Sequence, residues 1–184
     1  MRLTPNMNDI IDRETELREL REMATADERH LALLYGRRRV GKTFLLTHAW
    51  RDSHVEQLYF TASATSPAIN RRALLREART WADLELREQD HPTWRTVFQS
   101  IFELYPDRPL VVVLDEFQYL ADDRDGLGHV ASELNAVWES DLRREAGLLL
   151  VLSGSAIRSI KALESGGSPL FGRLDWRRKL DLIL

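Results

Sequence analysis

Runs of apolar residues alternate with amphipathic stretches along the 184-residue chain. Aliphatic runs at 31–35, 110–114 and 148–152 show no polar alternation, which is typical of strands covered on both faces of a parallel sheet. The run 58–61 predicts a further strand, and 179–184 predicts the last strand of the core. The sequence therefore predicts a layered α/β fold.

Between these runs, apolar residues recur at helical spacing. A first helix is predicted to begin near Asp12, a suitable N-cap, and further helices are expected at 41–51 and 130–144. Ser66-Pro67 opens one further helix and His91-Pro92-Thr93 opens another, because Pro fits the first turn of a helix. We interpret their apolar stripes as core and not as stacking platforms. The stripes are Ile69, Ala73, Leu74, Ala78 and Trp81, then Trp94, Phe98, Ile101 and Phe102.

A glycine-rich motif follows the first buried strand. Residues 36–43 fit the pattern G-x-x-x-x-G-K-[ST] at every fixed position. A strand that ends in such a loop and then begins a helix presents unpaired N–H groups and the positive end of a helix dipole to one point. Lys42 can reach the β- and γ-phosphates and Thr43 can bind Mg²⁺, whereas an accidental glycine turn would not need this strand and helix setting. The predicted nucleotide-binding segment is Gly36, Arg37, Arg38, Arg39, Val40, Gly41, Lys42, Thr43 and Phe44.

Two acidic residues end the second buried run. Asp115 and Glu116 come directly after 110–114, and ligands of parallel sheets gather at the carboxyl ends of the strands. Asp115 is expected beside Thr43, where it would hold Mg²⁺ through a water, and Glu116 would orient and polarise the attacking water. A solvated acidic turn is the alternative, and the phosphate loop makes it the weaker one.

Composition limits the remaining function classes. The chain is 43% hydrophobic and 30% charged, has a formal net charge of −3 and contains no cysteine. Disulfides and cysteine-ligated metals are therefore excluded, and the charge gives no reason to expect a membrane or, except weakly, a nucleic acid as partner. We find no signal peptide, repeat or linker, and we expect one cytoplasmic domain: an N-terminal helix segment at 1–30 and a nucleotide-binding core at 31–184.

Arginines form two further groups. Those at 37–39 lie inside the loop, where we expect a solvated or phosphate-supporting role, and Arg71, Arg72, Arg76 and Arg79 are interleaved with acids on an exposed helix face. Arg173 follows Gly172 in a loop after the third buried strand, where a guanidinium can meet charge on a γ-phosphate; a surface arginine is an equal alternative.

Five blocks together resemble the archaeal-type ATPases, which are prokaryotic P-loop ATPases related to the AAA+ and STAND groups. The blocks are residues 11–17, 35–43, 113–120, 152–155 and 168–173. The resemblance implies an ASCE-type three-layer core with an additional strand between the loop strand and the Asp-Glu strand, giving a parallel five-stranded sheet in the order 5-1-4-3-2. It also implies site roles: Arg13 and Glu14 near the base or ribose, Ser153 or Ser155 as polar sensor, Arg173 at the γ-phosphate, and Asp115 and Glu116 as above.

Members of this family usually continue into a helical lid, a winged helix and often a nuclease-like domain. Because the sequence stops at Leu184, we expect these regions to be missing and turnover by this chain alone to be weak. Three functions remain open: an ATPase that drives a conformational switch, a P-loop transferase, and a nucleotide-binding interaction module without turnover. ATP is expected over GTP because of the family resemblance and because no N-K-x-D motif, which reads guanine, is present. A homo-oligomer or a protein partner is possible, since Arg173 can serve its own or a neighbouring site.

Overall fold

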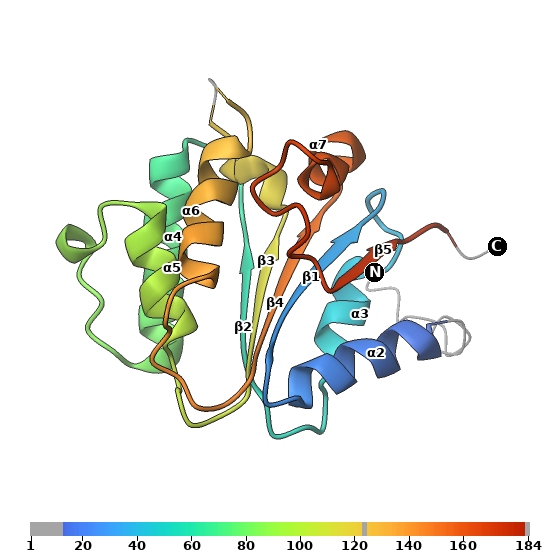
Figure 1. The fold of residues 1–184 in the computed structure, drawn as a ribbon, viewed down its shortest axis with the longest axis horizontal. Helices are drawn as coiled ribbons and strands as arrows, with labels where there is room; N and C mark the ends of the chain where they lie inside the picture. Colours follow the sequence, from blue (N-terminus) through green and yellow to red (C-terminus); the bar gives the residue numbers. More distant parts are fainter. Residues whose placement is uncertain (1–12, 123–124, 183–184) are drawn as a thin grey trace, which may run out of the picture.

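A five-stranded sheet forms the centre of the computed structural model, which describes residues 13–122 and 125–182 (Figure 1). Every strand pairing is parallel, and the order is β2-β3-β4-β1-β5. This confirms the predicted α/β class and the order 5-1-4-3-2, read from the other edge, with β4 between β1 and β3. The strands are β1 (Arg29–Tyr35), β2 (Glu56–Thr61), β3 (Leu110–Asp115), β4 (Leu148–Gly154) and β5 (Trp176–Lys179).

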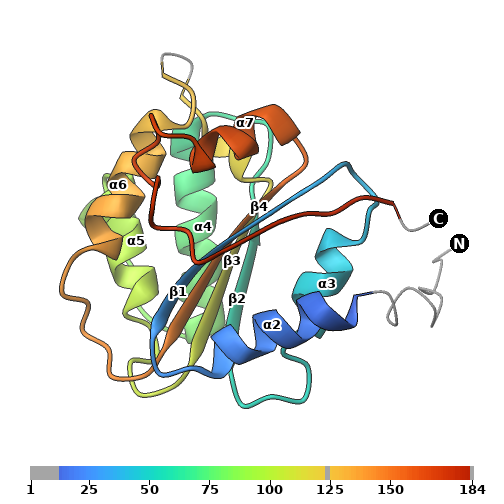
Figure 2. The ribbon, with the colours of Figure 1, turned by 45° about the vertical axis from the view of Figure 1, so that its right-hand side comes forward.

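Helices cover both faces of the sheet. Figure 2 shows α2 (Glu14–Thr25) and α3 (Lys42–His48) on one side, and α4 (Pro67–Ala82), α5 (Trp94–Phe102) and α6 (Gly128–Trp138) on the other. Shorter elements complete the connections: η1 (Glu88–Asp90), η2 (Phe117–Leu120), α7 (Ile157–Lys161) and η3 (Ala162–Glu164). Across the described ranges, no helix combines the length and the apolar character that crossing a bilayer requires.

Side chains of β1, β3 and β4 point alternately into two cores. Along β1, Leu31 and Leu33 pack under α4, α5 and α6, whereas Ala32 and Leu34 pack under α2 and α3. All residues of β3 and β4 are buried. Burial on both faces explains why these strands appear in the sequence as uninterrupted aliphatic runs.

Two predicted helix starts are confirmed. The Ser66 side chain accepts a hydrogen bond from the Ile69 N–H with Pro67 in the first turn, and Thr93 forms a capping box with Thr96. Ile69 is a correction to the predicted core stripe, because 49% of it is exposed in that first turn.

Helix boundaries differ in three places. The helix predicted at 130–144 spans Gly128–Trp138, and the one predicted at 41–51 spans Lys42–His48. The first helix begins at Glu14 with Arg13 as its N-cap residue, and the predicted cap Asp12 lies outside the described residues.

Arg144 lies in the connection that replaces the end of the predicted helix. Its guanidinium donates to six main-chain carbonyls, at distances from 2.7 to 3.3 Å. One belongs to Phe102, the last residue of α5, and three to the connection that follows it: Leu104, Tyr105 and Arg108. The other two belong to Ala146 and Gly147, directly before β4. Arg144 therefore joins two loops beside the amino ends of β3 and β4.

The last strand is also corrected. It covers Trp176–Lys179 and not 179–184, because it pairs only with β1, from Ala32 opposite Trp176 to Tyr35 opposite Lys179. β1 ends there because the phosphate loop begins at Gly36, so residues 180–182 have no strand to extend. Residues 183–184 lie outside the described part of the chain. Leu180 N–H still donates to the Tyr35 carbonyl at 2.7 Å.

Candidate functional site

The loop between β1 and α3 has glycines at both ends, and each is needed for a different reason. A Cβ on Gly36 would collide with the carbonyl oxygen of Leu180 in the segment after β5. Gly41 has φ 97°, a left-handed conformation that strains other residues, and a Cβ there would meet nothing within 4 Å. The loop therefore packs closely against Leu180 at Gly36 and has open space at Gly41.

Lys42 begins α3 and turns its ammonium group back beneath the loop. Nζ donates to the carbonyls of Gly36 at 2.7 Å and Arg37 at 2.9 Å, and the residue is 7% exposed. Burial lowers the pKa of Lys42, and the charge of Arg38 adds to this, whereas Glu116 and Asp115 oppose it. A cation is thus held at the loop with two acids nearby.

Asp115 is anchored at the end of β3 by a tyrosine that the sequence analysis did not single out. Tyr59 on β2 donates its hydroxyl to Asp115 Oδ2 at 2.6 Å, and Asp115 Oδ1 accepts from the Glu116 N–H at 2.8 Å. Burial and this hydrogen bond raise the pKa of Tyr59, while its hydrogen bond with Thr43 acts the other way. Thr43 and Asp115 therefore meet around one hydroxyl group, as the prediction that they are neighbours requires.

Glu116 follows in a left-handed conformation with φ 52°. Its Oε2 accepts hydrogen bonds from Ser155 Oγ at 2.8 Å and from Gln118 Nε2. Burial raises the pKa of Glu116, but the bonds from Ser155 and Gln118 and the charge of Lys42 outweigh it, so the net pKa is lowered. Glu116 is therefore ionised at neutral pH and held in one position.

The two serines predicted as polar sensors have different surroundings. Ser155 bonds to Glu116, whereas Ser153 is completely buried and its Oγ has no hydrogen-bond partner among the described residues. Between them, Gly154 leaves room for Gln118, since a Cβ would collide with Gln118 Oε1. Gln118 is a second site residue that the sequence analysis missed.

Arg13 and Glu14, the residues predicted near the base or ribose, are adjacent in the chain, but their side chains have different surroundings. Arg13 donates to the Asp181 carbonyl at 2.6 Å, beside a hollow of about 230 Å³ whose lining includes Arg37, Val40 and residues 179–182. Glu14 lines a different hollow along the exposed side of α2 with Leu17, Arg18, Arg21, Glu22 and Thr25. The structure thus brings Arg13, but not Glu14, to the segment next to the loop.

The remaining residues of the predicted loop segment lie at its outer side and in α3. Arg37, Arg38 and Arg39 are exposed, and Val40 is buried in the core under α2 and α3. Phe44 stacks on His48 with ring centroids 3.9 Å apart.

Arg173 is not brought to the loop of its own chain. Its Nε lies 3.0 Å from Glu139 Oε1, just past the end of α6. Two residues later, Asp175 N–H donates to the Leu31 carbonyl near the start of β1, four residues and roughly 13 Å along the strand from the residue that precedes the loop. That Arg173 acts at the site of a neighbouring copy remains a prediction.

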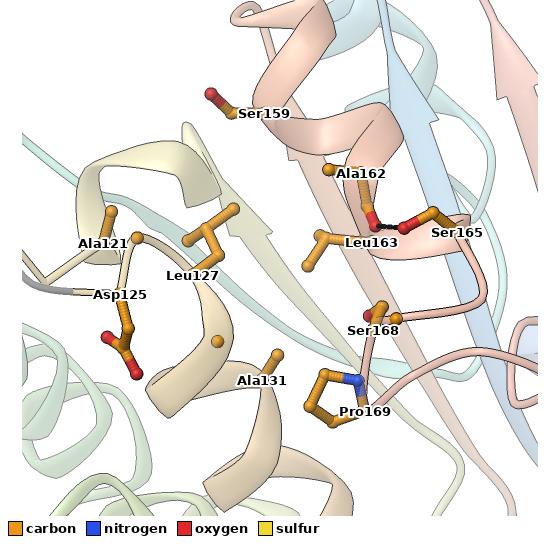
Figure 3. Close-up of a pocket in the computed structure, with 13 residues that line it drawn as sticks. Ala121, Asp125, Leu127, Ala131, Ser159, Ala162, Leu163, Ser165, Ser168 and Pro169 are labelled. Carbon is orange, nitrogen blue, oxygen red and sulfur yellow. Dashed lines mark hydrogen bonds between the residues drawn. The ribbon is translucent and has the colours of Figure 1, made fainter.

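A hollow of about 480 Å³ lies between the start of α6 and the segment from α7 to residue 169 (Figure 3). Leu127 and Ala131 lie on one side, and Leu163 and Pro169 lie on the other. Asp125 supplies the charged side chain of its lining, and no residue of the phosphate loop contributes. It is therefore separate from the cluster around Lys42.

Over residues 13–122 and 125–182, no group of three or more His, Cys, Asp or Glu side chains could hold a metal ion. Mg²⁺ at nucleotide sites commonly uses one or two protein oxygens together with phosphate oxygens and water. Thr43 and Asp115 provide such a pair.

Comparisons with known proteins agree with this geometry. A family described as an ATPase domain predominantly from Archaea matches residues 10–183. An uncharacterized protein of Methanocaldococcus jannaschii is 26% identical over 164 residues, which cover 89% of this chain and 34% of that protein.

Solved structures share the fold. A Walker-type ATPase of Pyrococcus abyssi matches with a TM-score of 0.62 and 22% identity, over 98% of this chain and 56% of the other. The ORC2 protein of Aeropyrum pernix, in ADPNP–ADP complexes, matches with a TM-score of 0.67 and 18% identity, over 91% and 47%. Cdc6p of Pyrobaculum aerophilum gives 0.63 and 17%, over 91% and 45%. The chain spans about half the length of these structures.

Proposed function

Because the chain belongs to a family of ATPase domains found predominantly in Archaea, we propose that it binds ATP at the loop before α3 and hydrolyses it with Mg²⁺ to drive a conformational switch. The observation that carries the proposal is the grouping of Lys42, Asp115 and Glu116 at the carboxyl ends of β1 and β3. One cation and two acids at the start of a helix suit a phosphate, a metal ion and a water molecule.

The residues fit a triphosphate. The space at Gly41 is open, and the Lys42 ammonium group is held by main-chain carbonyls, which a charged phosphate oxygen can replace with a stronger acceptor. The buried Ser153 hydroxyl has no hydrogen-bond partner among the described residues and can bond to a ligand or to a water. The ADPNP–ADP complexes of the ORC2 protein of Aeropyrum pernix favour adenine as the base.

Mg²⁺ would be held by Thr43 and, through water, by Asp115. The ion would neutralise charge on the β- and γ-phosphates. Tyr59 keeps the Asp115 carboxylate in place by its 2.6 Å hydrogen bond, so the position of the acid is fixed before any ion binds.

Glu116 would act as the general base. Its lowered pKa keeps it ionised, and its second oxygen can orient a water and accept its proton as that water attacks the γ-phosphorus. The bond from the γ-phosphorus to the β–γ bridging oxygen then breaks, which gives ADP and phosphate. Ser155 and Gln118 hold the carboxylate during this step.

Lys42→Ala is expected to remove most of the affinity for ATP with Mg²⁺, about 10- to 100-fold, because the phosphates lose their main side-chain cation. Isothermal titration calorimetry of both proteins measures this. Lys161→Ala is a matched control, since Lys161 is an exposed lysine on α7. Equal affinities of wild type and Lys42→Ala would refute ATP binding at this loop.

We also propose that Arg173 acts on the γ-phosphate in a neighbouring copy, since it does not reach the loop of its own chain. Specific ATPase activity should then rise with protein concentration and fall about 10-fold or more in Arg173→Ala. A rate per molecule that stays constant across a wide dilution series would contradict this arrangement.

The switch would act on a further protein or a nucleic acid. Adding the correct partner should change the rate of ATP hydrolysis.

A further inference from the structure

Arg38 connects the phosphate loop to the segment that follows Glu116. Its Nη2 donates to the Tyr119 hydroxyl at 2.9 Å. Arg38 lies four residues before Lys42, and Tyr119 lies in η2, three residues after Glu116. The guanidinium therefore spans from the loop to the segment beside the proposed base.

The three arginines of the loop differ in their contacts. All are exposed and none forms an ion pair within the part of the chain that the structure describes. Arg37 lines the hollow next to residues 179–182, and Arg38 reaches Tyr119 instead. Of the three, it is Arg38 whose guanidinium is bonded to the segment following Glu116.

Arg38 and Lys42 place two positive charges in the loop and at the first residue of α3. Burial is the largest cause of the lowered pKa of Lys42; Glu116 and Asp115 oppose it, and the charge of Arg38 has a smaller effect in the same direction as burial. The hydrogen-bond partners of the two cations are neutral oxygens: a phenol for Arg38 and carbonyls for Lys42. A phosphate oxygen near both groups would give each cation a charged acceptor in place of a neutral one.

We propose that Arg38 contacts the terminal phosphate of ATP in its own chain and thereby distinguishes the triphosphate from the diphosphate. In this exchange the guanidinium leaves the Tyr119 hydroxyl for a phosphate oxygen. A charge-assisted bond to phosphate is roughly twice as strong as a bond to a neutral oxygen, and the planar guanidinium can form two such bonds in parallel. The inference rests on the proposed ATP site and adds a residue that reads its terminal phosphate.

Tyr119 stays in place during the exchange. Its carbonyl accepts a hydrogen bond from Asn70 Nδ2 at 3.1 Å, and Asn70 is completely buried. The main chain of η2 is therefore fixed, and the exchange needs a change only in the exposed Arg38 side chain.

The test compares two affinities of each protein by calorimetry with Mg²⁺ present: that for ADPNP, a triphosphate analogue that is not hydrolysed, and that for ADP. Arg38→Ala is expected to weaken ADPNP binding about 10- to 100-fold and ADP binding by less than about threefold. Arg37→Ala removes the same charge from the same loop, and we expect it to change both affinities by the same factor. Circular dichroism confirms that the variants are folded.

Tyr119→Phe supplies an independent readout. It removes the competing acceptor of Arg38, so ADPNP affinity should rise by about two- to fivefold while ADP affinity stays constant. A merely structural role of the tyrosine would not raise the affinity for one nucleotide alone. A fall in ADPNP affinity would therefore contradict the exchange.

Failure of this inference is distinguishable from failure of the proposed function. If wild type binds ADPNP and Lys42→Ala does not, but Arg38→Ala changes the ratio of the two affinities no more than Arg37→Ala does, Arg38 does not read the terminal phosphate. If wild type binds neither nucleotide, both proposals fall.

Discussion

Glu116→Gln is expected to bind ATP with nearly wild-type affinity and to hydrolyse it roughly 10²–10⁴-fold more slowly. The amide keeps the size of the carboxylate and can still accept the hydrogen bond from Ser155 Oγ, which is 2.8 Å from the wild-type oxygen. It cannot accept a proton from water at neutral pH. Calorimetry gives the affinity, and single-turnover phosphate release gives the rate of the chemical step.

Glu164→Gln is the matched control. Glu164 is a half-buried glutamate that contacts Tyr35 and Arg177 and takes no part in the proposed chemistry. Its rate should remain within about twofold of wild type. If Glu116→Gln hydrolyses ATP as fast as wild type, Glu116 is a structural residue, and the transferase or the binding module without turnover becomes the better interpretation.

The second large effect is on stability. Arg144→Ala is expected to lower the free energy of unfolding by about 2–4 kcal/mol, because six carbonyls lose a charged donor and two loops lose their connection. The free energy of unfolding of Arg144→Lys should lie between those of wild type and Arg144→Ala, since an ammonium group has three donors but lacks the planar fork of a guanidinium. Urea denaturation followed by tryptophan fluorescence measures the differences.

Arg143→Ala provides the comparison for Arg144. The Arg143 side chain is 90% exposed and lies 3.8 Å from a Glu103 carboxylate oxygen, so its loss should cost less than about 1 kcal/mol. If the two alanine variants are equally stable, the carbonyl cluster does not contribute measurably. Because Arg144 lies away from the phosphate loop, folded Arg144→Ala should bind ATP like wild type.

The sequence predicted the α/β class and the buried strands because their physical signals are local, whereas the strand order came from the resemblance of five blocks to a known family. The roles of the site residues remain predictions. Strands buried on both faces, such as β3, need uninterrupted aliphatic residues, and a loop that holds phosphates needs glycines at fixed spacing. Thr43 and Asp115 could be placed together because strand ends of a parallel sheet meet at one edge.

Other site residues carry no such local signal. Tyr59 contacts Asp115 because β2 is the neighbour of β3, and that neighbourhood is set by the order of the strands and not by the residues around Tyr59. Gln118 in η2 depends in the same way on Gly154, which is the last residue of β4. For the same reason the range of β5 was predicted wrongly: the end of β1 decides it, not the apolar content of residues 179–184.

The close fit of Gly36 on Leu180 has a mechanical consequence. The segment after β5 is joined to the floor of the loop by contact at Gly36, by the bond from Leu180 N–H to Tyr35, and through Asp181 to Arg13 at the start of α2. When one of two packed main-chain segments moves, the other moves with it, since packed interiors have low compressibility. A displacement of residues 180–182 would therefore move the phosphate loop. In the same way, a ligand bound in the loop would displace residues 180–182 and the start of α2.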